Sequence, residues 1–427
     1  MIQESGIPHL VEHLFRHEAG KMVSVLTRIF GTHNLDLAED VVQDSLVEAL
    51  TEWQYKGIPD KPSAWLFSVA RNKALNILHR ENYKRKYKSQ LLHFPDANIT
   101  TDPALSHFFS EQEIQDDQLR MIFTCCHPSI STDSQIALAL KTLCGFSIPE
   151  IAKAFLTSED NINKRLVRAR QKIRNAKIPF EIPGKNDLGK RLSAVLETIY
   201  LLFNEGYSAS KGNDIIRYEL CEEAIRLAQI IAANEIIQHK GNVHALLALM
   251  FLNASRFKAR QDDKGNLLTM AEQDRCLWDK QMKDIGLRHL SEASKNDGIS
   301  TYHILAAISA QYSITPDYEF TDWETILSLY NNLVQLDNSP VILLNRAIVI
   351  SKVSGERKAL DELGKIKHDP SLRSYYLFYS TQAEFYMRLN EFADAINSLE
   401  KAIRLAPLQP EKDMLEKKII LCRKQII

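Results

Sequence analysis

The stretch that decides the predicted fold is LCGFSIPEIAKAFLTSEDNINKRLVRARQKIR, residues 143–174. Its pattern predicts two short helices joined by a tight turn. Ser147 can cap the first helix, with Pro149 just inside its start and Glu150 three residues after the cap. Ser158 is the candidate cap of the second helix, because serine accepts a hydrogen bond from the first turn.

The second helix of this stretch combines an apolar stripe with polar and basic faces. Ile162, Leu166 and Ala169 recur at helical spacing, so we expect them to face inward. The other faces carry mainly polar and basic side chains, among them Asn161, Asn163, Lys164, Arg165 and Arg168. This is the layout of a helix-turn-helix, whose second helix enters the major groove of DNA. An amphipathic helical hairpin with a solvated basic face fits the same pattern.

Charge is distributed unevenly along the 427 residues, although the net charge is only −1. Between Arg71 and Lys88, Glu81 is the single acidic residue among many basic ones. From Lys164 to Lys177 there is no acidic residue. Two separate basic stretches in the first half of the chain suggest two contacts with one long polyanion.

Several classes of protein are disfavoured by what the sequence lacks. We expect a cytoplasmic protein without a membrane segment, because we find neither a secretory signal nor an apolar run long enough to span a bilayer. We expect no cofactor and no metal, and no enzyme, because no acid, base and nucleophile cluster together. Cys125, Cys126 and His127 could form a metal or redox site, but buried reduced thiols are the ordinary interpretation.

A predicted helix from about Asp36 to Trp53 carries an acidic side. Asn34 or Asp36 can cap it, and Glu39 follows Asp36 at the spacing of a capping box. The acidic side is either solvated or a docking face for a basic partner. Its polar members are Asp36, Glu39, Asp40, Gln43 and Asp44.

A further helix, predicted from a cap at Ser63 to Arg80, has one apolar and one polar side. Cations suit phosphates, amides suit base edges and aromatic rings suit unstacked bases. Trp65, near the start of this helix, fits the hydrophobic core as well as it fits a base. The polar side offers Arg71, Asn72, Asn76, His79 and Arg80.

Two segments in register resemble a known family. WLFSVARNKALNILHR, preceded by DLAEDVVQDSLVEAL, is similar to the second conserved domain of bacterial extracytoplasmic-function sigma factors. GFSIPEIAKAFLTSEDNINKRLVRARQKIR resembles their fourth domain. The segment LRMIFTCCHPSISTDSQIALALKTLCGFSIPEIAKAF narrows the resemblance to the group with a long C-terminal, tetratricopeptide-like extension.

The resemblance implies partners and site residues. The partners are core RNA polymerase, bound through the clamp and flap regions of its large subunit, and promoter DNA. The resemblance assigns docking on the polymerase to the acidic side described above, from Asp36 to Asp44. The loop from Tyr55 to Lys61 corresponds to one that captures a flipped base. Binding of the −10 element falls to Trp65, Arg71, Asn72, Lys73, Asn76, His79 and Arg80, and binding of the −35 element to Ser158, Asn161, Asn163, Lys164, Arg165 and Arg168.

The predicted architecture is all-α. It consists of sigma domain 2 (residues 1–90), a linker (91–115), sigma domain 4 with the helix-turn-helix (116–180), and a C-terminal helical-repeat extension (185–427). The clearest repeat runs from Tyr379 to Pro407, where Ala383, Tyr386, Ala395 and Ala402 occupy tetratricopeptide offsets. We expect the extension to regulate the factor through an intramolecular or protein ligand, and a helical cap without any ligand is the alternative.

The function predicted from the sequence is transcription initiation. The factor would bind core polymerase, recognise a two-part promoter and promote melting of the −10 region. The alternative is a helix-turn-helix regulator or a repeat scaffold that acts without polymerase. Such a regulator has no need of the helix from Trp65 to Arg80, which distinguishes the two hypotheses.

Overall fold

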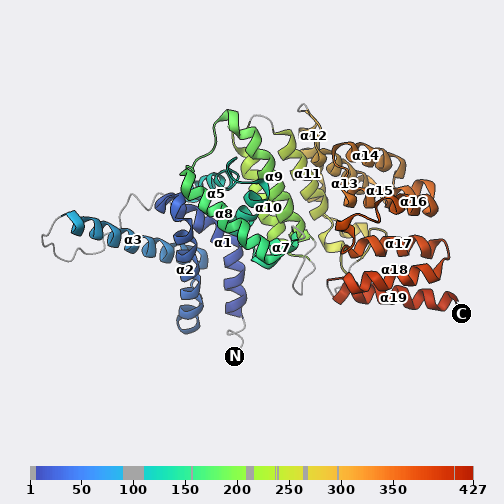
Figure 1. Ribbon diagram of the computed structural model, residues 1–427, viewed down its shortest axis with the longest axis horizontal. Coiled ribbons are helices and arrows are strands. Elements are labelled where there is room, and N and C mark those ends of the chain that lie inside the picture. Colours follow the sequence, from blue (N-terminus) through green and yellow to red (C-terminus); the bar gives the residue numbers. More distant parts are fainter. Residues whose placement is uncertain are drawn as a thin grey trace. The chain divides into compact units, whose positions relative to one another are not determined.

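The computed structural model describes residues 6–89, 110–154, 157–207, 216–235, 237, 240–262, 268–295, 298–407 and 409–426. Within these ranges the chain is built of helices and contains no β-strand, which confirms the all-α prediction. None of the helices described is both long and apolar enough to cross a bilayer. Figure 1 shows the succession of helices, coloured along the sequence.

The chain divides into two compact units. The first takes in the described residues of Met1–Gly206 and Tyr218–Ile236, and the second those of Tyr207–Arg217 and Ile237–Ile427. The helices of the first unit are α1 (Gly6–Phe30), the 3₁₀ turn η1 (Thr32–Asn34), α2 (Leu35–Lys56), α3 (Pro62–Ser89), α5 (Glu111–Cys125), α6 (Thr132–Leu143), α7 (Ile148–Ala154), α8 (Glu159–Ala176), α9 (Lys185–Tyr207) and α10 (Tyr218–Ala233).

The predicted helix-turn-helix is formed by α7 and α8. The capping box of α7 is confirmed: the backbone N–H of Ser147 donates to Glu150 Oε2 at 2.8 Å, and Ser147 Oγ accepts from the N–H of Glu150 at 3.4 Å. Ser158 caps α8 as predicted, because its Oγ accepts from the backbone N–H of Asn161 at 3.3 Å. Phe155 and Leu156, which follow α7 in the sequence, lie outside the described residues.

The inward face of α8 is also as predicted. Ile162, Leu166 and Ala169 are buried, and Ile173 continues the stripe one turn further on. The helix ends at Ala176 and is followed by Lys177, a left-handed residue with φ of 47°. This packed stripe holds the polar faces of α8 outward.

Four local predictions were wrong. Asn34 precedes α2 without a side-chain capping bond, and Glu39 contacts α8 instead of closing a capping box with Asp36. The α3 helix begins at Pro62, one residue before the predicted cap, because proline has a helical φ and no N–H to satisfy at a first turn. It runs to Ser89, well beyond Arg80. Most of the predicted linker lies outside the described residues, and α5 already begins at Glu111.

The second unit is a succession of helical hairpins. Its elements are α11 (Gly241–Ala254), η3 (Phe257–Ala259), η4 (Arg275–Leu277), α12 (Lys280–Ala293), α13 (Thr301–Ile314), α14 (Trp323–Leu336), α15 (Pro340–Ser354), α16 (Glu356–Ile366), η5 (Pro370–Leu372), α17 (Tyr376–Arg388), α18 (Phe392–Leu405) and α19 (Gln409–Ile426). In the α17–α18 hairpin, the predicted small residues Ala383, Ala395 and Ala402 are fully buried, and half-buried Tyr386 packs against them. Small side chains there let the two helices approach closely.

Candidate nucleic-acid and polymerase interfaces

The acidic side of α2 divides into an exposed part and a contacting part. Asp40, Gln43 and Asp44 are exposed, and Val47, one turn further on, is 59% exposed. Asp36 and Glu39 are half-buried because they face α8. The five residues predicted to dock a basic partner therefore do not form one free surface.

The contacts of Asp36 and Glu39 are with basic side chains of α8. Arg170 Nη2 lies 2.7 Å from Glu39 Oε2, and its Nε lies 3.3 Å from Asp36 Oδ1. Arg174 Nη1 lies 2.7 Å from Asp36 Oδ2. From α6, Thr142 Oγ1 donates to Glu39 Oε1 at 3.1 Å.

The polar side of α3 is presented to solvent. Asn72, Asn76, His79 and Arg80 are exposed and recur at helical spacing, so they share one face. Arg71 is half-buried. This face offers amide groups for base edges and a cation for phosphate.

Two further α3 residues predicted to bind DNA also make contacts within the protein. Lys73 Nζ lies 2.8 Å from Glu48 Oε2 of α2. Trp65 is half-buried and meets the buried ring of Trp53 edge to face, with centroids 5.4 Å apart. Both contacts hold α3 against α2, so these residues position the exposed face of α3.

The loop after α2 carries an exposed aromatic ring at its entrance. Tyr55, in the last turn of α2, is 85% exposed. Gly57 ends the helix with φ of 81°, a conformation that glycine adopts without strain, and its N–H returns to the Trp53 carbonyl. The predicted base-capturing loop, from Tyr55 to Lys61, was placed two residues too early, because Tyr55 and Lys56 belong to α2 and the loop begins at Gly57. The exposed ring of Tyr55 lies at its entrance.

The N-terminal half of α8 presents most of the predicted −35 residues. Ser158, Asn163, Lys164 and Arg168 are exposed. Asn161 Nδ2 donates to Thr157 Oγ1 at 2.8 Å, which orients the amide at the helix start. Val167 lies among these polar residues and is 60% exposed, away from the buried stripe. The sequence analysis did not identify this exposed apolar side chain.

Two basic side chains of α8 already have acidic partners. Lys164 Nζ lies 2.6 Å from Asp160 Oδ2 one turn earlier. Arg165 Nη2 lies 3.0 Å from Asp133 Oδ2 of α6. Because Lys164 and Asp160 are largely exposed, that pair is weak and its lysine can exchange partners readily.

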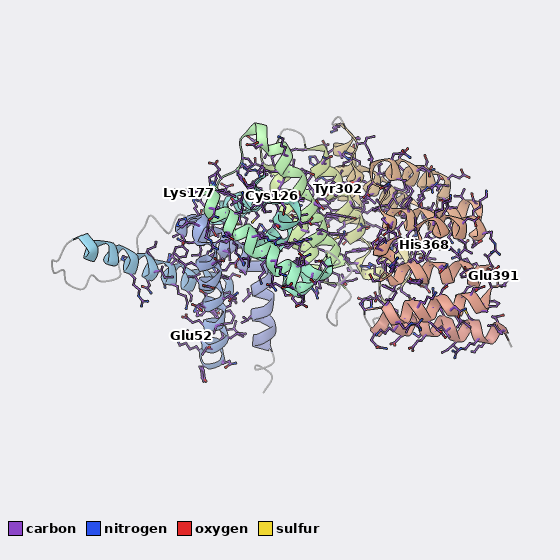
Figure 2. All side chains as sticks on the ribbon, in the orientation of Figure 1. Glu52, Cys126, Lys177, Tyr302, His368 and Glu391 are labelled. Atoms are coloured by element: carbon purple, nitrogen blue, oxygen red, sulfur yellow. The ribbon has the colours of Figure 1, made fainter. Side chains whose placement is uncertain are left out.

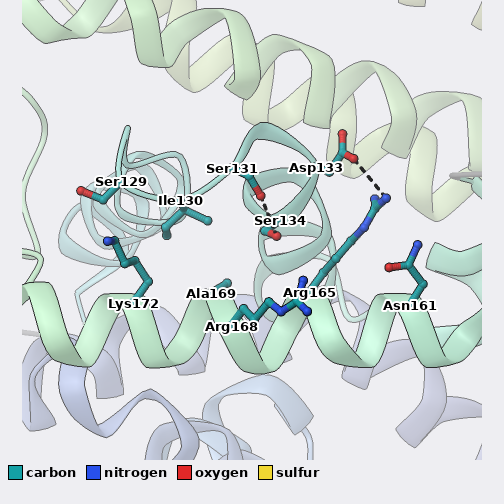
Figure 3. A pocket seen from close by; sticks show the side chains of 10 residues that line it. All are labelled: Ser129, Ile130, Ser131, Asp133, Ser134, Asn161, Arg165, Arg168, Ala169 and Lys172. Atoms are coloured by element: carbon teal, nitrogen blue, oxygen red, sulfur yellow. Dashed lines mark hydrogen bonds and ion pairs between the residues drawn. The ribbon is translucent and has the colours of Figure 1, made fainter.

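A polar groove of about 410 Å³ separates α8 from the segment that leads into α6. Figure 3 shows Arg165 reaching across it to Asp133. Arg168 and Lys172 add positive charge from α8, and Ser129 and Ser131 line the opposite side. The groove is thus a cationic hollow beside the helix that sequence analysis assigned to DNA.

Family models match the two parts of the chain that carry these surfaces. Residues 14–83 match Sigma-70 region 2, and residues 120–173 match Sigma-70, region 4. The chain belongs to the sigma-70 family. It is of the extracytoplasmic-function-like kind with a C-terminal extension, and residues 191–294 of that extension match a family of unknown function (DUF6596).

A curated protein is similar to this chain over most of its length. The chain is 35% identical over 387 residues to "Uncharacterized protein R00370" of Rhizobium meliloti (strain 1021), an alignment that covers 90% of this chain and 89% of that protein. No solved structure matches the chain. As a sigma-70 factor, the protein binds DNA and RNA polymerase in transcription initiation. Factors of this family are generally not enzymes.

The adjacent thiols of region 4 lie in the protein interior. Cys125 and Cys126 are buried, and burial raises the pKa of Cys126 to about 12. Figure 2 labels Cys126 among the helices of the first unit. Among the residues that the structure describes, no group of three potential metal ligands occurs. A neutral buried thiol is a poor nucleophile and metal ligand.

Proposed function

We propose that this sigma factor recognises a two-part promoter, with α8 reading the −35 element and α3 engaging the melted −10 element. The observation that carries the proposal is the pair of exposed polar faces on α3 and α8. Each lies in a segment that matches the corresponding sigma-70 region. The face of α8 includes Ser158, Asn163 and Arg168, and that of α3 includes Asn72 and Asn76.

The chemistry of the two faces suits two forms of DNA. Asparagine and arginine side chains at the start of a recognition helix can read base edges in the major groove. On α3, the amides of Asn72 and Asn76 can pair with unstacked bases, while Arg80 can neutralise a phosphate. The exposed ring of Tyr55 gives the adjoining loop a surface on which a flipped base can stack.

The exposed acidic part of α2 is the proposed polymerase-docking surface. Asp40, Gln43 and Asp44 present carboxylates and an amide to a basic partner such as the clamp coiled coil of the large subunit. Region 4 would contact the flap. The polymerase supplies the chemistry of RNA synthesis, so the factor's tasks are placement and strand separation.

In vitro transcription with purified core polymerase tests this function. The chain should direct initiation at discrete sites on genomic DNA, read by sequencing transcript 5′ ends. Lys164→Ala with Arg168→Ala should reduce those transcripts at least tenfold, since each good base contact contributes about 1–3 kcal/mol. The charge-matched control is Lys177→Ala with Lys190→Ala, because both lysines are exposed and lie outside the proposed −35 contacts.

Two results would contradict the proposal. The first is the absence of any discrete initiation with the wild-type chain. The second is equal loss of transcripts in the Lys164/Arg168 variant and in the control, which would indicate a general effect of positive charge.

A further inference from the structure

A second polar pocket, of about 360 Å³, lies between the start of α6 and α9. Region 4 lines it with residues between Cys126 and Gln135, and α9 lines it with residues between Lys190 and Glu197. Because the match to DUF6596 begins at Arg191, region 4 and the extension build this pocket together. All of these residues belong to the first compact unit.

Arg191 places a buried positive charge in the wall of this pocket. The residue is only 8% exposed, and its Nη1 donates to the carbonyl oxygen of Phe123 at 3.2 Å. Its Nε has no hydrogen-bond partner among the residues that the structure describes. Burial lowers the pKa of Arg191, and the charges of Asp187 and Glu181 oppose this shift without a hydrogen bond. A buried cation is costly until a hydrogen-bonded anion compensates its charge.

The side chains around Arg191 do not supply that anion. Burial raises the pKa of the Cys126 thiol to about 12, so this thiol is neutral near pH 7. Among the described residues that line the pocket, Glu197 is the one carboxylate, and it is exposed to solvent. Lys190 adds a second positive charge from an exposed position. The lining therefore carries two cations against one carboxylate.

The start of α6 adds hydrogen-bond donors to the same pocket. Ser131 precedes the helix without a side-chain capping bond, and its Oγ instead donates to Ser134 Oγ at 3.0 Å. The first N–H groups of a helix have no partner within it, and the helix dipole favours a negative group there. Phosphate is commonly bound at such an end. Thr132 and Ser193 contribute hydroxyl groups to the lining.

We propose that this pocket binds a phosphate group, either as the free ion or as the monoester of a small molecule, with Arg191 donating the principal hydrogen bonds. The planar guanidinium matches the spacing of phosphate oxygens, and Lys190 adds charge. The volume lies in the range of small-molecule sites, which favours the monoester. Ile130 and Ser131 also line the cationic groove beside α8 (Figure 3), so the bound phosphate lies close to the helix that carries the −35 face.

Isothermal titration calorimetry of the full chain, at constant ionic strength, tests the site with inorganic phosphate and with glycerol phosphate. Both should bind saturably, and uncharged glycerol should not. Tighter binding of the ester identifies a phosphorylated molecule as the ligand, and tighter or equal binding of inorganic phosphate identifies the free ion. Arg191→Gln should weaken both affinities at least about tenfold, because it removes a charge-assisted hydrogen bond.

The control for Arg191→Gln is Arg275→Gln, which should bind both probes as wild type does. It removes another arginine that donates to a backbone carbonyl, that of Thr315 at 2.8 Å, in the second unit. A loss of phosphate binding in both variants would overturn the assignment to Arg191.

A second pair of variants keeps Arg191 and its bond to Phe123, and it decides the matter if Arg191→Gln does not fold. Ser193→Glu places a carboxylate at an exposed position of the lining and should weaken phosphate binding at least about tenfold. Ser193→Gln has a similar size without the charge and should bind as wild type does. Equal affinities of these two variants, or no saturable binding of either probe at millimolar concentration, overturn the proposal.

Discussion

The indole rings of Trp53 and Trp65 meet edge to face, with their centroids 5.4 Å apart. Trp53 is buried in α2, and Trp65 stands in the first turn of α3, half-buried. The pair therefore helps to hold α3 in a fixed orientation against α2, and with it the polar face of α3. An edge-to-face aromatic pair contributes about 0.5–1.5 kcal/mol beyond the apolar area that it buries.

Trp65→Ala should lower the free energy of unfolding of the first unit by about 2 kcal/mol, because it removes this pair and leaves a partial cavity. Trp65→Phe should retain most of that stability. Urea denaturation can be followed by the fluorescence of Trp53 after Trp278 and Trp323, both in the second unit, are changed to Phe. Tyr55→Ala is the control, since that ring is 85% exposed. Normal stability of Trp65→Ala together with lost promoter opening would show that Trp65 acts on DNA.

The exposed amides of α3 are expected to act after polymerase has bound. Asn72→Ala with Asn76→Ala should reduce the yield of open complex at least about thirtyfold, because two lost base contacts at about 1–3 kcal/mol each cost about 2 kcal/mol or more. Permanganate reactivity of the melted strand measures opening, and co-purification measures core binding, which should not change. The control is Gln54→Ala with Asn175→Ala, which removes two exposed amides that lie outside this face of α3. A loss of core binding in the α3 variant would place Asn72 and Asn76 in the polymerase interface instead.

Reversing the charge of the exposed part of α2 should weaken polymerase docking. Asp40→Lys with Asp44→Lys places two cations against a basic partner, and we expect at least a tenfold higher Kd for core, with a smaller difference at high salt. The comparison is Asp394→Lys with Glu400→Lys, which makes the same change of charge at exposed positions of α18. Equal affinities of the α2 variant and wild type would exclude the acidic surface as the docking site.

Asp117 should make the stability of region 4 depend on pH. Its carboxylate lies 2.6 Å from Arg120, yet burial raises its pKa from 3.8 to about 6. The folded state therefore binds the additional proton between about pH 4 and pH 6. Protonation of Asp117 therefore stabilises the fold most at low pH, and this contribution is lost as pH rises through 6. From pH 4 to pH 7, wild type should lose about 2 kcal/mol relative to Asp117→Asn.

Hydrogen exchange in α5 at several pH values measures this difference locally, which avoids treating a chain of two units as two-state. The neighbouring Asp116→Asn is the control. If the free-energy difference between wild type and Asp117→Asn stays constant across this pH range, burial does not govern the titration of Asp117.

The repeat hairpin of the extension gives a test of packing in the second unit. Ala395→Leu should lower the free energy of unfolding by about 1–3 kcal/mol, because Ala395 is fully buried between α17 and α18 and leaves no room for a larger side chain. Ala393→Leu changes the same residue type two positions earlier on α18, where the side chain is exposed. Hydrogen exchange in α17 and α18 should accelerate in the first variant alone.

Sequence reasoning succeeded where structure is decided within one or two helical turns. Ser147 with Glu150, Ser158 with Asn161, and the stripe through Ile162 are all set by contacts three or four residues apart. Such spacing is visible in the sequence because it follows from the geometry of the helix. The all-α class was predictable for the same reason.

The sequence could not reveal which charged residues meet across the fold. Glu39 and Arg170 are 131 residues apart, and nothing local to either one marks the other. The capping box predicted for Asp36 and Glu39 failed because α2 begins at Leu35, which places Asp36 inside the first turn. Glu39 instead accepts a charge-assisted hydrogen bond from Arg170. Lys73 and Arg165, both predicted to bind DNA, likewise have partners, Glu48 and Asp133, that only the packed helices bring near.

The distribution of the six cysteines has a practical consequence. Five of them are buried, and Cys276 in the second unit is exposed. Maleimides react with accessible thiolates, so unmodified protein should take up one dye or spin label, at Cys276. The natural chain thus carries its own attachment point for single-molecule observation of the extension, with no cysteine to remove and none to introduce.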